Sequence, residues 1–159
     1  MKRLLLTIDY VFLLVCTSMY LGTGWSLVLF SFPIAPSLTV DNYYMQFVPQ
    51  VTAATQFFTV MTVLMIAAAI VMLAAEWRRG LRWVPALVLI AVLAATLLTT
   101  QRILPLNAEM AAGIKDAARL SSILTAWMSL NRLRVGLWTI QWLALAVFFG
   151  RSFFCLREA

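Results

Sequence analysis

The chain has 159 residues, of which 64% are apolar and 11% are charged, and its net charge at pH 7 is +6. Soluble proteins average about 45–50% apolar and about 25% charged residues, so this composition excludes an ordinary soluble domain. No charged residue lies between Tyr10 and Val40 or between Asn42 and Ala75, and uncharged runs of this length indicate membrane-spanning helices. We therefore expect an all-α integral membrane four-helix bundle that forms one domain over residues 1–159. We expect its location to be the bacterial inner membrane, with the lipid bilayer as its main partner.

Several chemistries are disfavoured by what the sequence lacks. Histidine is absent, which removes the commonest metal ligand, general base and haem ligand. The sequence also has no CxxC, HExxH or P-loop motif, so we expect no cofactor and no metal. Cys16 and Cys155 lie at opposite ends of the chain, inside the first apolar run and beyond the last, so no disulfide is expected. Basic residues near helix ends set orientation and meet anionic lipid, so nucleic acid is not an expected partner.

The first predicted span covers about residues 8–32, with Asp9 at its inner edge. Pro33 and Pro36 are expected to end it, because proline disfavours helix continuation. The segment over residues 37–50 should lie at the membrane surface, because its tyrosines and phenylalanine are typical of an interfacial aromatic belt.

The second predicted span covers about residues 51–75, and its Gln56 is expected to point into the bundle. The short connection that follows, residues 76–83, is the clearest cytoplasmic marker, because positive charge favours the inner side. We therefore predict that both termini are cytoplasmic. Seven of the twelve basic residues then lie inside, namely Lys2, Arg3, Arg78, Arg79, Arg82, Arg151 and Arg157.

The third predicted span covers about residues 83–104 and is expected to stop at Pro105. Asn107 can then cap a short extramembrane helix over residues 108–120. The fourth predicted span covers about residues 127–150. Both predicted hairpins therefore carry a segment with an early proline on the outer side, a pattern that hints at a duplicated two-helix unit.

The candidate site is a polar stripe at the start of the fourth span. Its members follow the helical spacing i, i+4, i+7, i+11 and i+14, so they share one face of a helix. A polar face avoids lipid, and we expect this one to line a pocket in the outer leaflet. With two residues added from the preceding segment, the ligand-binding candidates are Arg102, Asn107, Trp127, Asn131, Arg134, Trp138 and Gln141.

Two interpretations of Arg102 and Arg134 stay open. Each arginine can extend to lipid phosphates at the interface. Alternatively, the two can converge on an anionic ligand, which the planar guanidinium binds with two parallel hydrogen bonds. The tryptophans can be interfacial anchors or can pack on a flat ligand, and Gln141 can make a hydrogen bond between helices.

A pattern in this region resembles that of a known family. Pro105-x-Asn107, followed by Trp127-x3-Asn131-x2-Arg134, is similar to the PxN…WxxxHxxR pattern of small four-helix membrane proteins that include the anthrone oxygenases. The resemblance implies a four-span bundle and, in some members, cofactor-free oxidation of polycyclic phenolic anthrones to quinones. Asn131 stands where that pattern has histidine, and asparagine cannot take up a proton near neutral pH.

The sequence therefore predicts a non-catalytic role as a binder of an apolar, aromatic or anionic small molecule, or as an accessory subunit beside other membrane-protein subunits. The alternative is an anthrone-oxygenase-like enzyme, in which Arg134 and Arg102 would stabilise a phenolate and Asn131 would orient it. No catalytic residue can be named for this enzyme. A small transporter is the second alternative, disfavoured because the only acid in a span is Asp9 at its edge.

Overall fold

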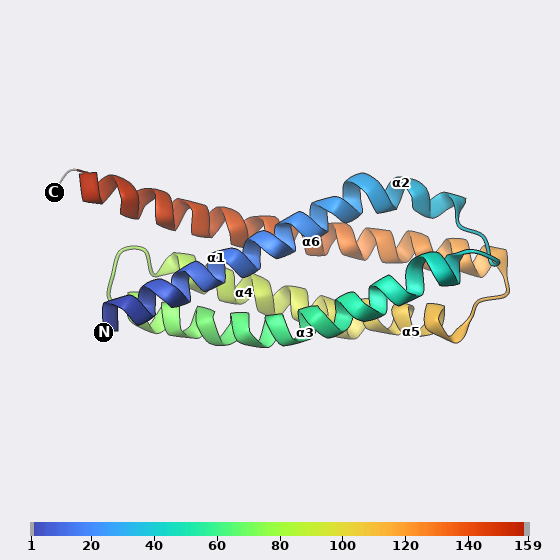
Figure 1. The fold of residues 1–159 in the computed structure, drawn as a ribbon, viewed down its shortest axis with the longest axis horizontal. Helices are drawn as coiled ribbons and strands as arrows, with labels where there is room; N and C mark the ends of the chain where they lie inside the picture. The colour runs from blue at the N-terminus through green and yellow to red at the C-terminus, as the bar shows by residue number, and fades with distance from the viewer. Residues whose placement is uncertain (1, 158–159) are drawn as a thin grey trace.

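The structure, a computed structural model, describes residues 2–157 and the side chains of residues 3–153. The described chain folds into four long helices, each antiparallel to the next along the chain (Figure 1). All four are long and apolar enough to cross a membrane. Both ends of the described chain lie at the same end of the bundle as the loop between the second and third helices, and the other two loops lie at the opposite end. The all-α four-helix architecture is thus confirmed.

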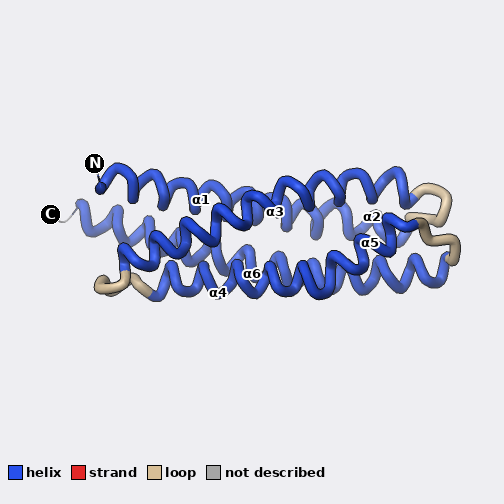
Figure 2. Tube along the Cα trace, turned by 90° about the horizontal axis from the view of Figure 1, so that it is seen from below, coloured by secondary structure: helices blue, strands red, loops and turns tan. Residues whose placement is uncertain are grey.

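Short loops join the helices at both ends of the bundle, as the tube in Figure 2 shows. The fourth helix alone has 41 residues, or about 61 Å, whereas about 20 residues cross a bilayer. The helices are therefore much longer than the predicted spans. The elements are α1 (Lys2–Ser26), η1 (Leu27–Ser31), α2 (Phe32–Ile34) and η2 (Ala35–Ser37) in the first helix, α3 (Tyr43–Glu76) in the second, α4 (Trp83–Leu98), η3 (Thr99–Ile103) and α5 (Leu104–Ala112) in the third, and α6 (Ala117–Arg157) in the fourth.

The prediction that Pro33 and Pro105 end their helices is wrong. Each proline follows a π-helical segment by two residues, η1 in the first helix and η3 in the third. The residue just before each proline donates its backbone N–H five positions back, to Leu27 and to Thr99. Proline has no backbone N–H and would interrupt the hydrogen bonds of an α-helix. The wider π turn shifts the hydrogen-bond register just before the proline, and the chain stays helical.

The buried apolar residues form two clusters along the bundle. One, which we call the terminus-end cluster, includes Leu13, Met65 and Leu145 and spans the half that holds the chain termini. The other, the loop-end cluster, includes Tyr43 and Met110 and fills the opposite end. The helical extensions beyond the predicted spans therefore pack around a core of their own.

Tyr43 connects the two loops at that end. Its hydroxyl donates to the carbonyl of Met110 over 3.1 Å and accepts from the backbone N–H of Ile114 over 2.5 Å. Tyr43 is 1% exposed, so it belongs to the core and not to the interfacial belt predicted for its segment. Gly113, with φ of 92°, lies in the left-handed region that favours glycine and ends α5.

The separate helix predicted over residues 108–120 is not formed. Instead α5 ends before a four-residue loop over residues 113–116, and α6 begins directly after it. The Asp116 carboxylate caps α6 by accepting from the backbone N–H groups of Ala118, over 3.1 Å, and Arg119, over 3.3 Å. Asn107, the predicted cap, lies inside α5.

Cys16 is buried in the terminus-end cluster. The Cys155 side chain lies outside the described ones, as do those of Lys2 and Arg157, which entered the prediction of topology.

Candidate functional site

Four of the predicted site residues form one hydrogen-bonded chain between the third and fourth helices. The Trp127 indole N–H donates to Asn107 Oδ1 over 3.0 Å. The Asn131 amide donates to the Trp127 carbonyl over 2.8 Å, and the Arg134 guanidinium donates to Asn131 Oδ1. We call Asn107, Trp127, Asn131 and Arg134 the polar chain.

Arg134 is held by neutral groups. Beyond its bond to Asn131, one guanidinium nitrogen donates to Thr99 Oγ1 over 3.3 Å, and the guanidinium carbon lies 4.7 Å from the Trp138 ring centroid. The Arg134 Nε is buried and has no hydrogen-bond partner. The ion pairs found among the described residues all involve other arginines. The positive charge of Arg134 is therefore not compensated by a carboxylate within the part of the chain that the structure describes.

Trp138 joins this site to the first two helices. Its ring is 5% exposed, and its centroid lies 4.6 Å from that of Tyr20. The Tyr20 hydroxyl donates to the Phe58 carbonyl over 3.1 Å and lies 2.5 Å from Thr62 Oγ1. Sequence reasoning missed Tyr20, Thr62 and Thr99, because their roles arise only when separate helices pack together.

Gln141 is fully buried, two helical turns from Arg134 on the same face of α6. Both its amide oxygen and its amide nitrogen lack a hydrogen-bond partner, so the interhelical bond considered from the sequence is not formed. A buried amide without hydrogen bonds destabilises the folded state by the free energy lost when the amide leaves water. Gln56, predicted to point inward, is instead exposed.

A groove of about 270 Å³ lies beside the polar chain, between α3 and α5. Its lining includes Phe47, Thr52, Gln56 and Asn107, and we call it the Asn107 groove. Two of these residues contact the same tryptophan. Asn107 accepts the hydrogen bond of Trp127, and the Phe47 ring centroid lies 4.7 Å from that of Trp127. The groove therefore adjoins the polar chain directly.

Arg102 does not join the polar chain. Its side chain is exposed and lines a different groove, of about 650 Å³, between the third helix and α6. We call this the Arg102 groove. The contacts of Arg134 are with Asn131, Thr99 and Trp138, so the two arginines do not form the single cationic pocket that one interpretation of the sequence predicted.

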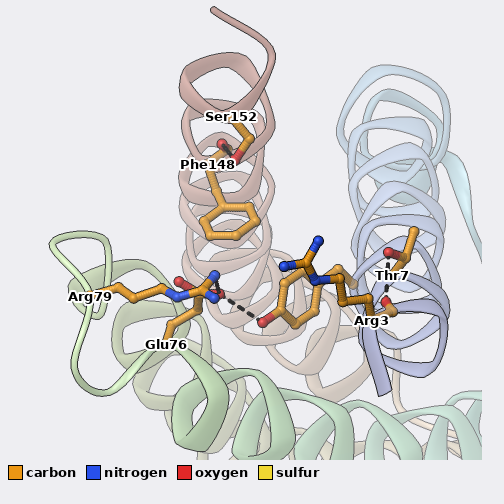
Figure 3. Close-up of polar contacts among 7 residues, drawn as sticks. Arg3, Thr7, Glu76, Arg79, Phe148 and Ser152 are labelled. Carbon is orange, nitrogen blue, oxygen red and sulfur yellow. Dashed lines mark hydrogen bonds and ion pairs between the residues drawn. The ribbon is translucent and has the colours of Figure 1, made fainter. Parts of the chain in front are cut away.

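A second polar cluster lies at the terminus end. Glu76 is 3% exposed, and its Oε1 accepts from the Tyr10 hydroxyl over 2.9 Å and from Arg79 over 3.0 Å. Figure 3 shows Glu76 and Arg79 together, with Phe148 on the neighbouring helix. Asp9, which precedes Tyr10 in the sequence, has one buried carboxylate oxygen without a hydrogen-bond partner. Sequence reasoning placed Glu76 in a connecting loop and missed this cluster.

Among the described residues, no group of three or more cysteine, aspartate or glutamate side chains could hold a metal ion. No protein-family model, no curated protein and no solved structure matches the chain. The functional assignment therefore depends on the polar chain and the two grooves.

Proposed function

We propose that this protein is a non-catalytic integral membrane protein that binds an apolar or aromatic small molecule with an anionic edge, at the outer boundary of the bacterial inner membrane. The proposal has three supports. These are the apolar length of the helices, the buried charge of Arg134, and the groove beside the polar chain.

The proposed membrane placement follows from the positions of charged residues. Arg78, Arg79 and Arg82 lie in the loop at the terminus end, and basic loops favour the cytoplasmic side. Both termini are then cytoplasmic. The hydrocarbon is about 30 Å thick, which corresponds to about 20 residues of helix. Counting this length back from Arg151 along α6 reaches Asn131 and Arg134. The polar chain is thus assigned to the outer boundary, and the loops of that end, with Tyr43 beside them, to the space beyond it.

The uncompensated charge of Arg134 carries the proposal. A cation among neutral groups near hydrocarbon is costly, and intramembrane charges usually have a partner or line a functional site. Asn131, Thr99 and Trp138 reduce this cost by hydrogen bonds and by contact with a ring face. They leave the net charge in place, so a bound anion or an electron-rich edge would be attracted strongly in this low dielectric.

The Asn107 groove supplies a place for the apolar part of such a guest. Phe47 offers an aromatic wall, and Thr52, Gln56 and Asn107 add polar atoms. A mostly apolar groove with a few polar groups is the usual character of a small-molecule site. The Trp127 indole contacts Asn107 and Phe47, two residues that line the groove, so binding should change the emission of Trp127.

The test is tryptophan fluorescence of detergent-solubilised protein titrated with 2-naphthoate and, separately, with naphthalene. We expect tighter binding of 2-naphthoate, because only this probe carries an anionic edge. Arg134→Gln should remove the preference, an effect of about tenfold or more from loss of a charged contact. Ala108→Phe, which fills the Asn107 groove, should weaken the binding of both probes.

Arg132→Gln is the matched control. Arg132 is exposed, and its guanidinium carbon lies 5.7 Å from the Phe32 ring centroid, without a hydrogen bond to any residue of the polar chain. This variant should keep the preference for 2-naphthoate. Equal affinities of wild type for the two probes would contradict the proposal, as would equal losses in the Arg132 and Arg134 variants. Unfolding temperatures of all variants show whether each protein is folded.

An accessory-subunit role is the other non-catalytic form of this proposal. In that form, a carboxylate of a neighbouring membrane subunit would compensate Arg134 in place of a small molecule. Purification from native membranes in mild detergent separates the two forms. A stoichiometric partner lost in Arg134→Gln, but not in Arg132→Gln, would favour the subunit.

The enzyme alternative rests on the resemblance to the anthrone-oxygenase pattern. Asn131 Oδ1 already accepts a hydrogen bond from the Arg134 guanidinium, and an amide cannot act as a general base. Incubation of wild type and Arg134→Gln with an anthrone under oxygen tests this alternative. Quinone formation that depends on Arg134 would support it over a binding role.

A further inference from the structure

We infer that the Arg102 groove is a specific binding site for one anionic phospholipid of the outer leaflet, with the lipid phosphate at Arg102. This inference uses the membrane placement proposed above. It does not depend on the proposed guest of the Asn107 groove, because the two grooves share no lining residue.

Arg102 lacks an internal partner, unlike the other described arginines at the loop end of the bundle. Arg119 makes two hydrogen bonds to Glu109, of 2.7 and 2.8 Å, and Arg132 lies over the Phe32 ring. Arg102, by contrast, has no hydrogen bond, ion pair or ring contact to any other described residue, and it is exposed. Its charge is therefore free to meet an external anion.

The depth of Arg102 matches that of a phosphate. It follows Trp83, which begins α4, by 19 residues, or about 28 Å of helix. Trp83 comes directly after the basic loop assigned to the cytoplasmic side. Because the hydrocarbon is about 30 Å thick, the guanidinium lies at the level of the outer headgroups. An arginine at this level can donate two parallel hydrogen bonds to one phosphate.

The surroundings of Arg102 fit the two ends of a lipid. Gln101 and Ser129 are exposed beside it and make no side-chain hydrogen bond to other described residues. Both can donate to phosphate oxygens. Leu98 and Leu130 line the same groove and can contact an acyl chain. An isolated interfacial arginine lacks these additional donors and walls, and so would not retain one lipid.

An anionic headgroup is favoured over a zwitterionic one by charge. Arg102 adds one positive charge to the groove, and the lining contains no acidic residue. Each basic residue near a membrane surface contributes about 1 kcal/mol of attraction to anionic lipid, or roughly fivefold in affinity. The groove should therefore select phosphatidylglycerol over phosphatidylcholine.

The test is native mass spectrometry of the full-length protein, titrated in detergent with phosphatidylglycerol or phosphatidylcholine. Wild type should bind one phosphatidylglycerol at least about fivefold more tightly than phosphatidylcholine. Arg102→Gln should abolish this preference, and Arg132→Gln should keep it. Ala126→Leu, which narrows the groove without changing charge, should weaken binding of the first lipid of either kind.

Several outcomes would overturn the inference. Equal effects of Arg102→Gln and Arg132→Gln would mean that anionic lipid responds only to total surface charge. No effect of Ala126→Leu would mean that the groove does not hold the lipid. A cross-link from Ser129→Cys to another membrane protein, with lipid binding unchanged in Arg102→Gln, would assign the groove to a protein partner. None of these outcomes changes naphthoate binding, so the proposed function is tested separately.

Discussion

Gly24 lies so close to Trp138 that no larger residue fits between α1 and α6. A Cβ added at Gly24 would come within 2.8 Å of Trp138 Cε3 and 2.9 Å of Val135 Cγ2. The Trp138 ring cannot move freely, because it packs on Tyr20 and on the Arg134 guanidinium. We therefore expect Gly24→Ala to lower the free energy of unfolding by about 1–3 kcal/mol, measured by denaturation in detergent.

Gly22→Ala is the control for this prediction. Gly22 is on the same helix, and a Cβ there meets no atom within 4 Å. The higher helix propensity of alanine should leave stability unchanged or raise it by up to about 1 kcal/mol. An equal loss of stability in both variants would show that the contact with Trp138 is not the cause.

Tyr43→Phe should destabilise the loop end of the bundle. The change removes the acceptor of the Ile114 N–H and the donor to the Met110 carbonyl while keeping the ring. A buried N–H left without a partner costs about 1–3 kcal/mol. Amide hydrogen exchange should show faster exchange around residues 110–116. Tyr44→Phe, at an exposed neighbouring position, should leave both stability and exchange unchanged.

Tyr10→Phe should weaken the polar cluster at the terminus end. The Tyr10 hydroxyl donates to the nearly buried Glu76, and a hydrogen bond to a charged group contributes about 1.5–3 kcal/mol. Combined with Arg79→Gln, the loss should exceed the sum of the single losses, because Glu76 then loses both donors. Additive losses in this double-mutant cycle would mean that the two donors act independently.

Gln141→Leu should stabilise the protein. The wild-type amide is fully buried and both its polar atoms lack partners, so an apolar side chain of similar size removes a desolvation cost of about 1–3 kcal/mol. The free energy of unfolding in detergent is the measurement. Gln50→Leu changes an exposed amide on α3 and should have little effect. A less stable Gln141→Leu protein would mean that the amide has a hydrogen-bonding partner in solution.

The four helices and the polar face of α6 could be predicted from the sequence. Long uncharged runs predict the four helices. The regular spacing of polar and aromatic residues predicts the inward-facing side of α6, on which Trp127, Asn131, Trp138 and Gln141 are all buried. Both predictions depend on patterns within one helix. The partners of these residues on other helices, such as Thr99 and its bond to Arg134, depend on packing and leave no local signal.

The predicted ends of the helices were less accurate. Proline disfavours the middle of an α-helix, yet the helix continues past Pro33 and Pro105, each of which follows a π segment, and Pro49 lies inside α3. The segment over residues 108–120 was predicted as a separate helix because Pro105 was expected to stop the third span and Asn107 to cap a new helix. Its apolar residues, including Met110 and Leu120, instead complete the loop-end cluster.

The two π segments lie at the level of the buried cation Arg134. Arg134 bonds Thr99, the first residue of η3, and its neighbour Val135 lies against Gly24, three residues before η1. Wide turns and prolines are where helices bend most readily. When the loop-end part of the third helix leans about this level, it should move the α5 wall of the Asn107 groove relative to the α3 wall and leave the terminus-end cluster in place. Access to Arg134 would then be gated by bending of the helices themselves.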